Sequence, residues 1–197
     1  MKRIDALRII ADHTAELPVV VTCAASSREL AAVADRPNHL YLLDAMGLAG
    51  SVATGVALGI ADTAVPKVVA VEGDGSLLMN PNVLATAGYL RPAKLLMVLL
   101  DNGVYGATGN LPTYGARIDL GDLAMAAGWT VRRAGDEREL AQRLAAALTA
   151  DGPTLLHTRI EVGNAPDVPK LLEHPLIIGR RFQDWLAVRT SAAEAVR

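Results

Sequence analysis

Two glycine-bearing segments of the sequence carry oxygen atoms that could together hold a metal ion and a phosphate group. The first segment is Glu72-Gly73-Asp74-Gly75-Ser76, and the second is Asp101-Asn102-Gly103-Val104. Asp74 offers a carboxylate, Asn102 an amide oxygen, and Val104 a backbone carbonyl that follows a glycine turn. Mg²⁺ takes about six oxygen ligands and commonly accepts several of them from phosphates and water. These residues therefore predict a Mg²⁺–diphosphate site.

Gly73 and Gly75 strengthen this prediction, because glycine permits a tight turn and lets a ligand approach the backbone closely. The N–H groups of Gly75 and Ser76 would then lie free at the start of the next helix, where anions bind. Taken alone, the segment fits an ordinary strand-to-helix turn equally well, and its pairing with Asn102 favours the site. The sequence holds no P-loop, and Leu78 replaces the third glycine of the dinucleotide-binding motif.

Six short apolar runs alternate with helix-length segments along the chain. The runs, which we expect to be strands, are 18–22, 40–43, 67–71, 95–100, 130–133 and 153–158, and the expected helices are 47–61, 81–90, 120–127, 136–150 and 175–188. Apolarity is continuous rather than alternating, which is typical of parallel strands covered on both faces. The pattern predicts an α/β fold, with one domain over residues 1–197 built on a doubly wound, mainly parallel sheet with helices on both faces. Ligands of such sheets bind beyond the carboxyl ends of the strands, where both glycine-bearing segments fall.

Composition and charge exclude several classes of protein. The formal net charge of −2 leaves no basic excess for binding nucleic acid. The one cysteine, Cys23, can form neither an internal disulfide nor an iron–sulfur site. The sequence begins without the apolar run of a signal peptide, and the uncharged stretch 45–61 is too short for a membrane span, so a buried soluble helix is expected there. We expect a cytoplasmic protein that binds neither nucleic acid nor membrane.

The order Gly73-Asp74-Gly75-Ser76, followed by an asparagine after the next strand, resembles the cofactor motif of thiamine-diphosphate enzymes. The resemblance implies thiamine diphosphate and Mg²⁺ as cofactors, with the metal bound by Asp74, Asn102 and the Val104 carbonyl. It also implies a wider set of cofactor-binding residues: Asp44, Ala45, Met46, Gly73, Asp74, Gly75, Ser76, Asn102, Val104, Tyr105 and Gly106. Met46 is similar to the bulky residue that bends the cofactor in this family, although ordinary core filling explains a methionine there too.

Three longer stretches narrow the resemblance. Ser27–Leu30, Gly73–Asn80 and Asp101–Thr113 are similar to the beta subunit of sulfopyruvate decarboxylase and to the C-terminal half of phosphonopyruvate decarboxylases. The resemblance implies the diphosphate-binding subunit of a two-chain 2-oxoacid decarboxylase. It also implies an alpha, aminopyrimidine-binding subunit as the partner, in a dimer of heterodimers or a larger assembly.

The glutamates of this chain do not fit the role of the one that acts on the aminopyrimidine in this family. Glu72 lies too close to Asp74 to reach the far end of the cofactor, and Glu16 and Glu29 are expected to be surface charges. We therefore expect no catalytic residue in this chain, an essential glutamate on the partner subunit, and no activity of the chain alone.

The sequence departs from this family near the expected substrate. The family's Gly-x-Pro before Ser-Arg-Glu is Ala24-Ala25-Ser26 here, and two polar positions after the asparagine turn are Ala107 and Leu111. Lost hydrogen-bond donors would weaken the binding of an anionic substrate. Three alternatives to sulfopyruvate or phosphonopyruvate decarboxylation therefore stay open: another 2-oxo acid, carboligation, and a non-catalytic cofactor-binding module.

Weaker signals come from isolated polar side chains. Thr108 and Asn110 either contact substrate or diphosphate, or simply cap their loop. Arg28 either meets an anionic substrate tail or is a surface arginine. The histidines show no metal-ligand spacing and are expected to be structural or exposed: His13, His39, His157 and His174.

Overall fold

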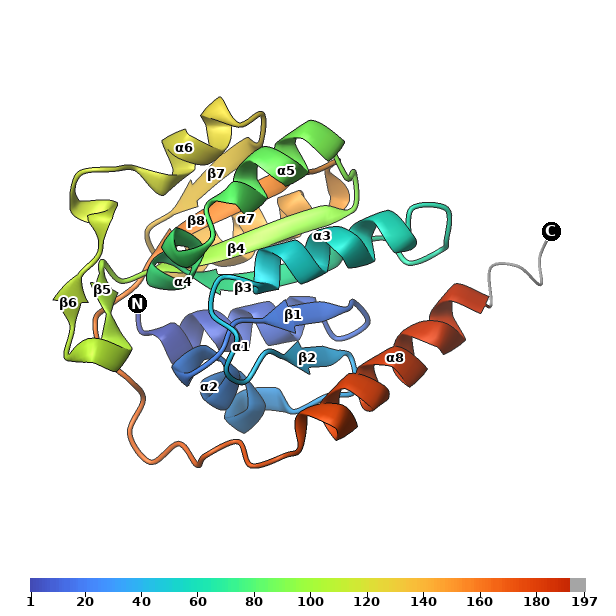
Figure 1. The fold of residues 1–197 in the computed structure, drawn as a ribbon, viewed down its shortest axis with the longest axis horizontal. Coiled ribbons are helices and arrows are strands. Elements are labelled where there is room, and N and C mark those ends of the chain that lie inside the picture. The colour runs from blue at the N-terminus through green and yellow to red at the C-terminus, as the bar shows by residue number, and fades with distance from the viewer. Residues whose placement is uncertain (192–197) are drawn as a thin grey trace.

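The computed structural model describes residues 1–191, which fold around a parallel sheet of six strands (Figure 1). The sheet contains β1 (Val19–Val21), β2 (His39–Tyr41), β3 (Val68–Gly73), β4 (Leu95–Asp101), β7 (Thr130–Ala134) and β8 (Thr154–Arg159). Their order across the sheet is β2-β1-β3-β4-β8-β7, and every neighbouring pair is parallel. Each expected strand is present, so the predicted parallel α/β sheet is confirmed.

The two central strands explain why apolarity is continuous in this sequence. Every residue of β4 is buried, and in β3 burial continues from Val68 to Glu72. Successive strand residues face opposite sides of a sheet, so Val71 joins one hydrophobic cluster while Ala70 joins the other. Both faces of the sheet therefore need a layer of helices.

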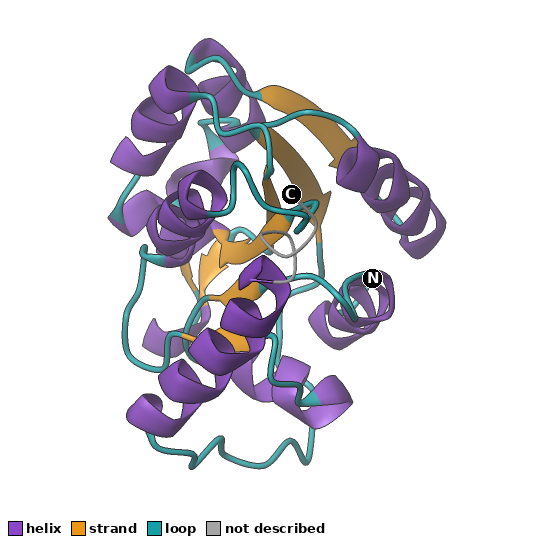
Figure 2. Cartoon of the chain, turned by 90° about the vertical axis from the view of Figure 1, so that its right-hand side faces the viewer, coloured by secondary structure: helices purple, strands orange, loops and turns teal. Residues whose placement is uncertain are grey.

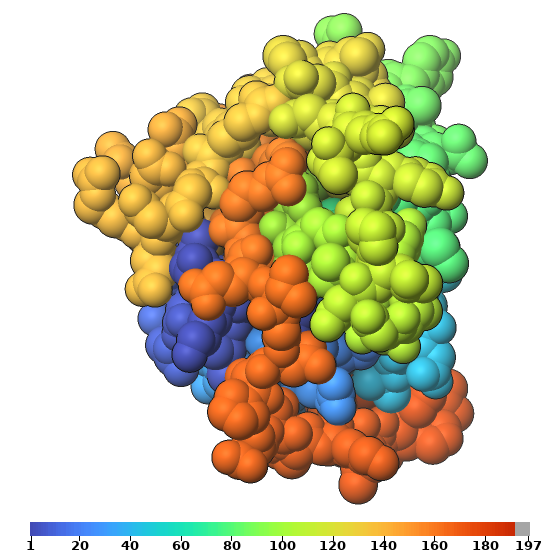
Figure 3. All heavy atoms as spheres, turned by 90° about the vertical axis from the view of Figure 1, so that its left-hand side faces the viewer, coloured from blue at the N-terminus to red at the C-terminus, as the bar shows by residue number. Residues whose placement is uncertain are grey.

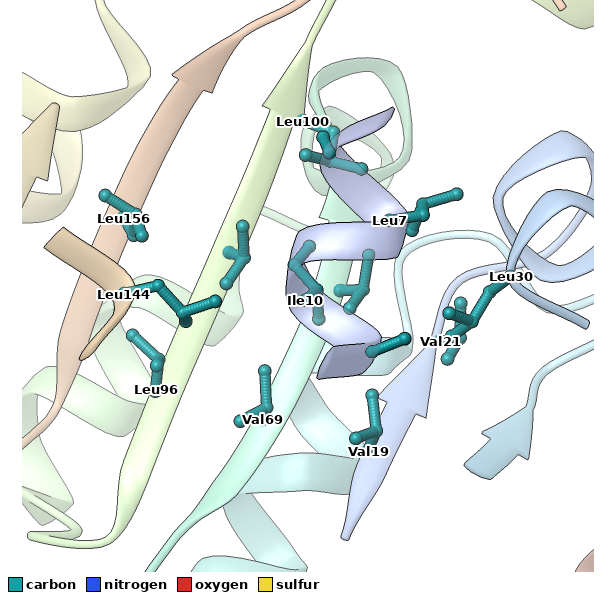
Figure 4. Close-up of a cluster of buried hydrophobic side chains, with 14 of the residues drawn as sticks. Leu7, Ile10, Val19, Val21, Leu30, Val69, Leu96, Leu100, Leu144 and Leu156 are labelled. Atoms are coloured by element: carbon teal, nitrogen blue, oxygen red, sulfur yellow. The ribbon is translucent and has the colours of Figure 1, made fainter. Parts of the chain in front are cut away.

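Helices cover both faces of the sheet (Figure 2). One face is packed by α1 (Arg3–His13), α2 (Ala25–Ala34) and α7 (Glu137–Thr149), and the other by α3 (Ala49–Gly59), α4 (Asp74–Met79), α5 (Asn82–Leu90) and α6 (Leu120–Ala126). Figure 4 shows the first layer, in which Leu7 and Ile10 of α1 and Leu144 of α7 lie over the sheet. This arrangement confirms the doubly wound fold.

Two segments extend from the carboxyl ends of the strands. After β4 the chain forms an antiparallel hairpin of β5 (Val104–Tyr105) and β6 (Leu111–Pro112), with a 3-10 turn between them at Gly106–Thr108. After β8 an irregular segment leads to α8 (Pro175–Ser191), which packs against the edge strand β2. In Figure 1 this segment passes along one side of the molecule before α8 begins.

The helices match the predicted segments in part. α3, α5, α6, α7 and α8 overlap the expected helices, whereas α1, α2 and α4 occur where no helix is predicted. α3 was expected to be a buried helix, but only one side of it is buried. Ala53 is fully buried, whereas Leu58 is 45% exposed. Within residues 1–191, none of the helices combines the length and the apolar composition that a membrane span requires.

Candidate functional site

A cleft of about 440 Å³ opens at the carboxyl ends of β1, β3 and β4. Its walls come mainly from residues 22–26 after β1, residues 73–76 where β3 passes into α4, and the segment 102–108 after β4. Figure 3 views the molecule from this end, where the yellow-green segment that holds the β5–β6 hairpin lies beside the orange segment that follows β8. The cleft therefore lies at the edge of the sheet where the sequence predicts a ligand site.

Asp74 is the first residue of α4 and the acidic residue that lines the cleft. Its side chain is buried, with the residue 2% exposed. Oδ2 accepts a hydrogen bond from the Thr113 hydroxyl at 2.8 Å, and Oδ1 accepts one from the Asn102 N–H at 3.4 Å. Burial raises the pKa of this carboxyl, an effect that the Thr113 hydrogen bond opposes. No lysine, arginine or histidine forms an ion pair with Asp74 in residues 1–191, and a buried carboxylate without a cation fits a site for a divalent metal.

The turn that holds the other two predicted metal ligands contacts Asp74, and both Asn102 and Val104 line the same cleft. Asn102 contacts Asp74 through its backbone, and its side-chain Oδ1 accepts a hydrogen bond from the Val104 N–H at 3.1 Å. Gly103 has a φ of +74°, a conformation that glycine adopts without strain, and this allows the turn between them. A carboxylate, an amide oxygen and a backbone carbonyl form the hard-oxygen donor set that Mg²⁺ prefers. The residues present therefore fit the ion that the resemblance implies.

Gly73, the last residue of β3, and Gly75, in the first turn of α4, have different structural roles. Gly73 has extended backbone with φ −101°, so the expected tight turn does not need glycine conformational freedom. A Cβ on Gly73 would meet nothing within 4 Å, and the missing side chain therefore leaves cleft space open. A Cβ on Gly75 would lie 2.7 Å from the Tyr105 ring, so this glycine is needed by a neighbouring side chain. The helix begins without a side-chain cap, which leaves its first N–H groups available to an anion.

The Ser76 side chain connects α4 to the segments that follow β1 and β2. Its Oγ accepts a hydrogen bond from the Gly47 N–H at 2.8 Å and shares another with the Thr22 hydroxyl at 2.8 Å. The hydroxyl is therefore engaged within the protein, and contact with a diphosphate through the Ser76 N–H stays a prediction.

Met46 lies in the turn after β2 and lines the cleft. It is 39% exposed and belongs to neither hydrophobic cluster, so core filling does not account for it. Asp44 and Ala45 lie outside the residues that line the cleft, and Asp44 is exposed. Of the predicted Asp44–Met46 group, the structure brings Met46 to the cleft.

The hairpin after β4 supplies another wall of the cleft and contacts the first turn of α4. Tyr105, Gly106 and Thr108 line the cleft, and the Thr108 hydroxyl also donates to the Tyr105 carbonyl at 3.1 Å, so both of its predicted roles have a basis. Asn110 has a φ of +64°, is exposed and lies outside the cleft lining. Asparagine tolerates that conformation better than most residues, which gives Asn110 a role in the hairpin. Leu111 lines the cleft and is 60% exposed.

The segment after β1 forms a third wall of the cleft. The sequence placed Ala24-Ala25-Ser26 near the expected substrate but did not assign Thr22 or Cys23 to the site. Thr22, Cys23 and Ala24 all line the cleft. Ala24 has φ 62° and ψ −129°, a strained conformation for a residue with a Cβ, and it is the position where the resembled family carries glycine. The sequence does contain a signal for this wall, because the segment directly follows an apolar strand and ligands of parallel sheets bind beyond the carboxyl ends of the strands.

Two buried groups lie near this segment. Glu72 is 1% exposed, and burial raises the pKa of its carboxyl, while hydrogen bonds from Ser76, Thr22 and the Gly73 N–H oppose the rise. Cys23 is buried as expected, and burial together with the Glu72 charge raises the pKa of its thiol. A raised thiol pKa means little thiolate at neutral pH, so Cys23 is a poor nucleophile.

The prediction that Glu29 is a surface charge is wrong. Glu29 is 2% exposed and accepts two hydrogen bonds from Arg3, at 2.7 and 3.2 Å. Its Oε1 also accepts from the Ala165 N–H at 3.0 Å. Glu16 is exposed as expected and pairs with Arg189. Arg28 is half-buried and lines the cleft, and its side chain has no hydrogen-bond or ion-pair partner among the residues described.

One protein-family model matches this chain over most of the segments that form the cleft. The model of the thiamine pyrophosphate enzyme C-terminal TPP binding domain matches residues 22–158. The chain belongs to the thiamine pyrophosphate enzyme family. Thiamine pyrophosphate and thiamine diphosphate are the same compound, so the resemblance predicted from Gly73–Ser76 and Asn102 is confirmed at the level of the family.

The curated relatives of this chain are named as decarboxylases. The chain is 41% identical to a phosphonopyruvate decarboxylase of Streptomyces viridochromogenes over 186 residues, which cover 93% of this chain and 46% of that protein. It is 40% identical to a sulfopyruvate decarboxylase subunit beta of Methanothermobacter thermautotrophicus over 169 residues, 86% of each chain. The chain thus spans about half of the first relative and most of the second.

Solved structures support the fold. A benzoylformate decarboxylase from Polynucleobacter necessarius matches 82% of this chain and 33% of its own, with a TM-score of 0.70 and 19% identity. A 4-hydroxybenzoylformate decarboxylase from Rhodococcus jostii matches 84% of this chain and 33% of its own, with a TM-score of 0.65 and 21% identity. At these identities the likeness is one of architecture.

Proposed function

We propose that this chain binds the diphosphate of thiamine diphosphate through a Mg²⁺ ion held by Asp74, Asn102 and the Val104 carbonyl. The observation that carries the proposal is Asp74, a buried carboxylate that lines the cleft and has no cationic partner in residues 1–191. Gly73, Gly75, Ser76, Tyr105 and Gly106 would surround the diphosphate, since all of them line the same cleft.

The activity that fits this site is decarboxylation of a 2-oxo acid. Thiamine diphosphate, when bound, supplies the electron sink that loss of CO₂ requires. The chain's own residues would hold and orient it: Asp74 and Asn102 through the metal, and Met46 through contact with the body of the cofactor. Ala45 and the Asp44 backbone would complete this contact in the turn after β2.

A partner subunit would complete the active site. Among residues 1–191, Asp74 is the one acidic side chain that lines the cleft, and the proposed site needs it for the metal. The glutamate that acts on the aminopyrimidine would therefore come from an alpha, aminopyrimidine-binding chain, in a dimer of heterodimers or a larger cytoplasmic assembly. The relative that is named a beta subunit, 86% of which this chain covers, supports this proposal.

The cleft supports two classes of substrate. Arg28, which lines it and whose side chain has no partner among the residues described, favours a 2-oxo acid with an anionic tail, such as sulfopyruvate or phosphonopyruvate. Ala107 and Leu111 also line it and offer no hydrogen bond, which favours a 2-oxo acid with an apolar tail. The names of the relatives make the anionic tail our first choice.

The test is decarboxylation of sulfopyruvate, phosphonopyruvate and an aliphatic 2-oxo acid, with Mg²⁺ and thiamine diphosphate. Each substrate is offered to this chain alone and to its mixture with a candidate alpha chain from the same organism. We expect aldehyde and CO₂ from the mixture only, and no product after Asp74→Ala. Full activity of the chain alone would overturn the proposed partner. An acyloin product with an added aldehyde would indicate carboligation, and cofactor binding without turnover would indicate a non-catalytic module.

A further inference from the structure

The carboxylate of Asp101 joins two parts of the molecule. Asp101 is the last residue of β4 and is 1% exposed. Its Oδ1 accepts a hydrogen bond from the Gly103 N–H at 3.0 Å. Its Oδ2 lies 2.7 Å from Nε2 of His157 and 3.0 Å from Nη1 of Arg159, both on β8. One oxygen therefore fixes the turn after β4, and the other fixes the neighbouring strand.

That turn is the one that carries two of the proposed metal ligands. It contains Asn102, whose Oδ1 accepts from the Val104 N–H, and Gly103, whose carbonyl accepts from the Thr113 N–H at 2.9 Å. The Asn102 N–H points to Asp74. A shift of the Gly103 peptide would therefore move the Asn102 side chain and the Val104 carbonyl together.

Of the two β8 side chains that hold Asp101, His157 is the enclosed one. His157 is 3% exposed, whereas the side chain of Arg159 is 53% exposed, and water competes for an exposed pair. The first turn of α6 covers the histidine: a Cβ on Gly121 would lie 3.2 Å from Nδ1, and the Asp119 carboxylate lies 3.8 Å from the same atom. The ring is thus held between β8 and α6 with Nε2 directed at Asp101.

We propose that His157 is a positioning residue for the cofactor metal, acting through Asp101 on the Asn102–Val104 turn. The proposal rests on the Mg²⁺ site proposed above. A donor at Nε2 holds the Asp101 carboxylate, the carboxylate holds the Gly103 N–H, and the turn then presents the Asn102 and Val104 oxygens in register with Asp74. Residues that orient metal ligands in this indirect way commonly change metal affinity about 10- to 100-fold when they are replaced.

Two substitutions at His157 separate positioning from simple packing. Glutamine places an amide N–H close to the position of Nε2, whereas asparagine is shorter and places it close to Nδ1. We expect His157→Asn to raise the Mg²⁺ concentration for half-maximal thiamine diphosphate binding about 10- to 100-fold. His157→Gln should stay close to the wild type. Binding is measured by calorimetry, well below each variant's melting temperature, and His13→Gln on exposed α1 surface is the matched control.

Three results would count against the proposal, and they differ in what they overturn. Equal, wild-type Mg²⁺ dependence in both His157 variants would remove the positioning role and leave the proposed site intact if Asp74→Asn still loses binding. Equal losses in both variants would show that the ring is needed for packing rather than for its Nε2 donor. No Mg²⁺-dependent binding by the wild-type chain would overturn the proposed site and this inference with it.

Discussion

The Thr113 hydroxyl donates a hydrogen bond of 2.8 Å to the Asp74 carboxylate, and the two residues are 3% and 2% exposed. They lie far apart in the sequence and come from different elements, one following β6 and the other beginning α4. Because both are enclosed, water does not compete for the bond, and the carboxylate is held in one orientation. The Asn102 N–H fixes its other oxygen.

Replacing Thr113 by valine should loosen Asp74 without changing the volume of the side chain. We expect Thr113→Val to weaken Mg²⁺-dependent binding of thiamine diphosphate about 10- to 100-fold, since the hydroxyl orients a metal ligand. Calorimetry at fixed Mg²⁺ measures the change. Thr149→Val, on the exposed end of α7, is the matched control and should bind like the wild type. Unaltered binding by Thr113→Val would contradict the prediction.

Glycine at position 24 should stabilise the fold. Ala24 occupies φ 62° and ψ −129°, where a Cβ costs about 1–3 kcal/mol of strain, and glycine is free of that strain. After the entropy that glycine loses on folding, we expect Ala24→Gly to gain about 1 kcal/mol, or about 2–4 °C in melting temperature. Ala32→Gly, at an exposed position within α2, should instead lose about 1 kcal/mol. Equal losses in the two variants would show that Ala24 is unstrained.

His39 should make the fold sensitive to acid. Burial and the neighbouring Arg36 lower its pKa from 6.5 to about 4, and its Nε2 is buried with no hydrogen-bond partner among the residues described. Because the folded protein disfavours the protonated ring, neutral His39 is compatible with the fold above pH 6.5. The free energy of unfolding falls as the pH drops from 6.5 toward 4, where the unfolded chain binds the proton more readily. Integrated over that window, the loss is about 3 kcal/mol.

The measurement is urea unfolding of the wild type and His39→Leu across that pH window. Both proteins share the titration of all other groups, so the difference between them isolates the histidine. We expect the free energy of unfolding of the wild type, relative to that of His39→Leu, to fall steadily below pH 6.5. A difference that stays constant down to pH 4.5 would mean that His39 does not titrate as described.

Arg28 should discriminate between substrates by the charge of their tails. A charge-assisted hydrogen bond contributes about 1.5–3 kcal/mol, so Arg28→Gln should raise the KM for sulfopyruvate or phosphonopyruvate about 10- to 100-fold. The KM for pyruvate, which has no charged tail, is the internal control and should not change. The assay needs the assembled two-chain enzyme. A parallel rise for all three substrates would assign Arg28 to the fold or to the shared 2-oxo acid group.

Local patterns in the sequence were enough to predict the sheet and the proposed metal ligands. Val68–Glu72 and Leu95–Asp101 are buried on both faces, so their apolarity is continuous and needs no knowledge of the fold. Asp74 and Asn102 follow these strands directly, and parallel strands bring their carboxyl ends to one edge. The sequence pattern could also have predicted α1, because one helical face carries all of its buried residues, which are Ala6, Leu7, Ile10 and Ala11.

The features that sequence reasoning missed depend on contacts between distant segments. Glu29 can be buried because Arg3 and the Ala165 N–H donate hydrogen bonds to its carboxylate, and no local sequence pattern predicts either partner. The same holds for His157, which is paired with Asp101 only because β8 lies beside β4. The residue before α2 is the strained Ala24, which has no capping side chain, so the usual start signal of a helix is missing there.

The central claim is that Asp74 binds the metal that holds the cofactor, and calorimetry of thiamine diphosphate with and without Mg²⁺ tests it most directly. The wild-type chain should bind thiamine diphosphate only with Mg²⁺, Asp74→Asn should lose more than about 100-fold in affinity, and Asp12→Asn, on exposed α1 surface, should bind like the wild type. Equal binding by the wild type and Asp74→Asn, or binding that does not depend on Mg²⁺, would contradict the account.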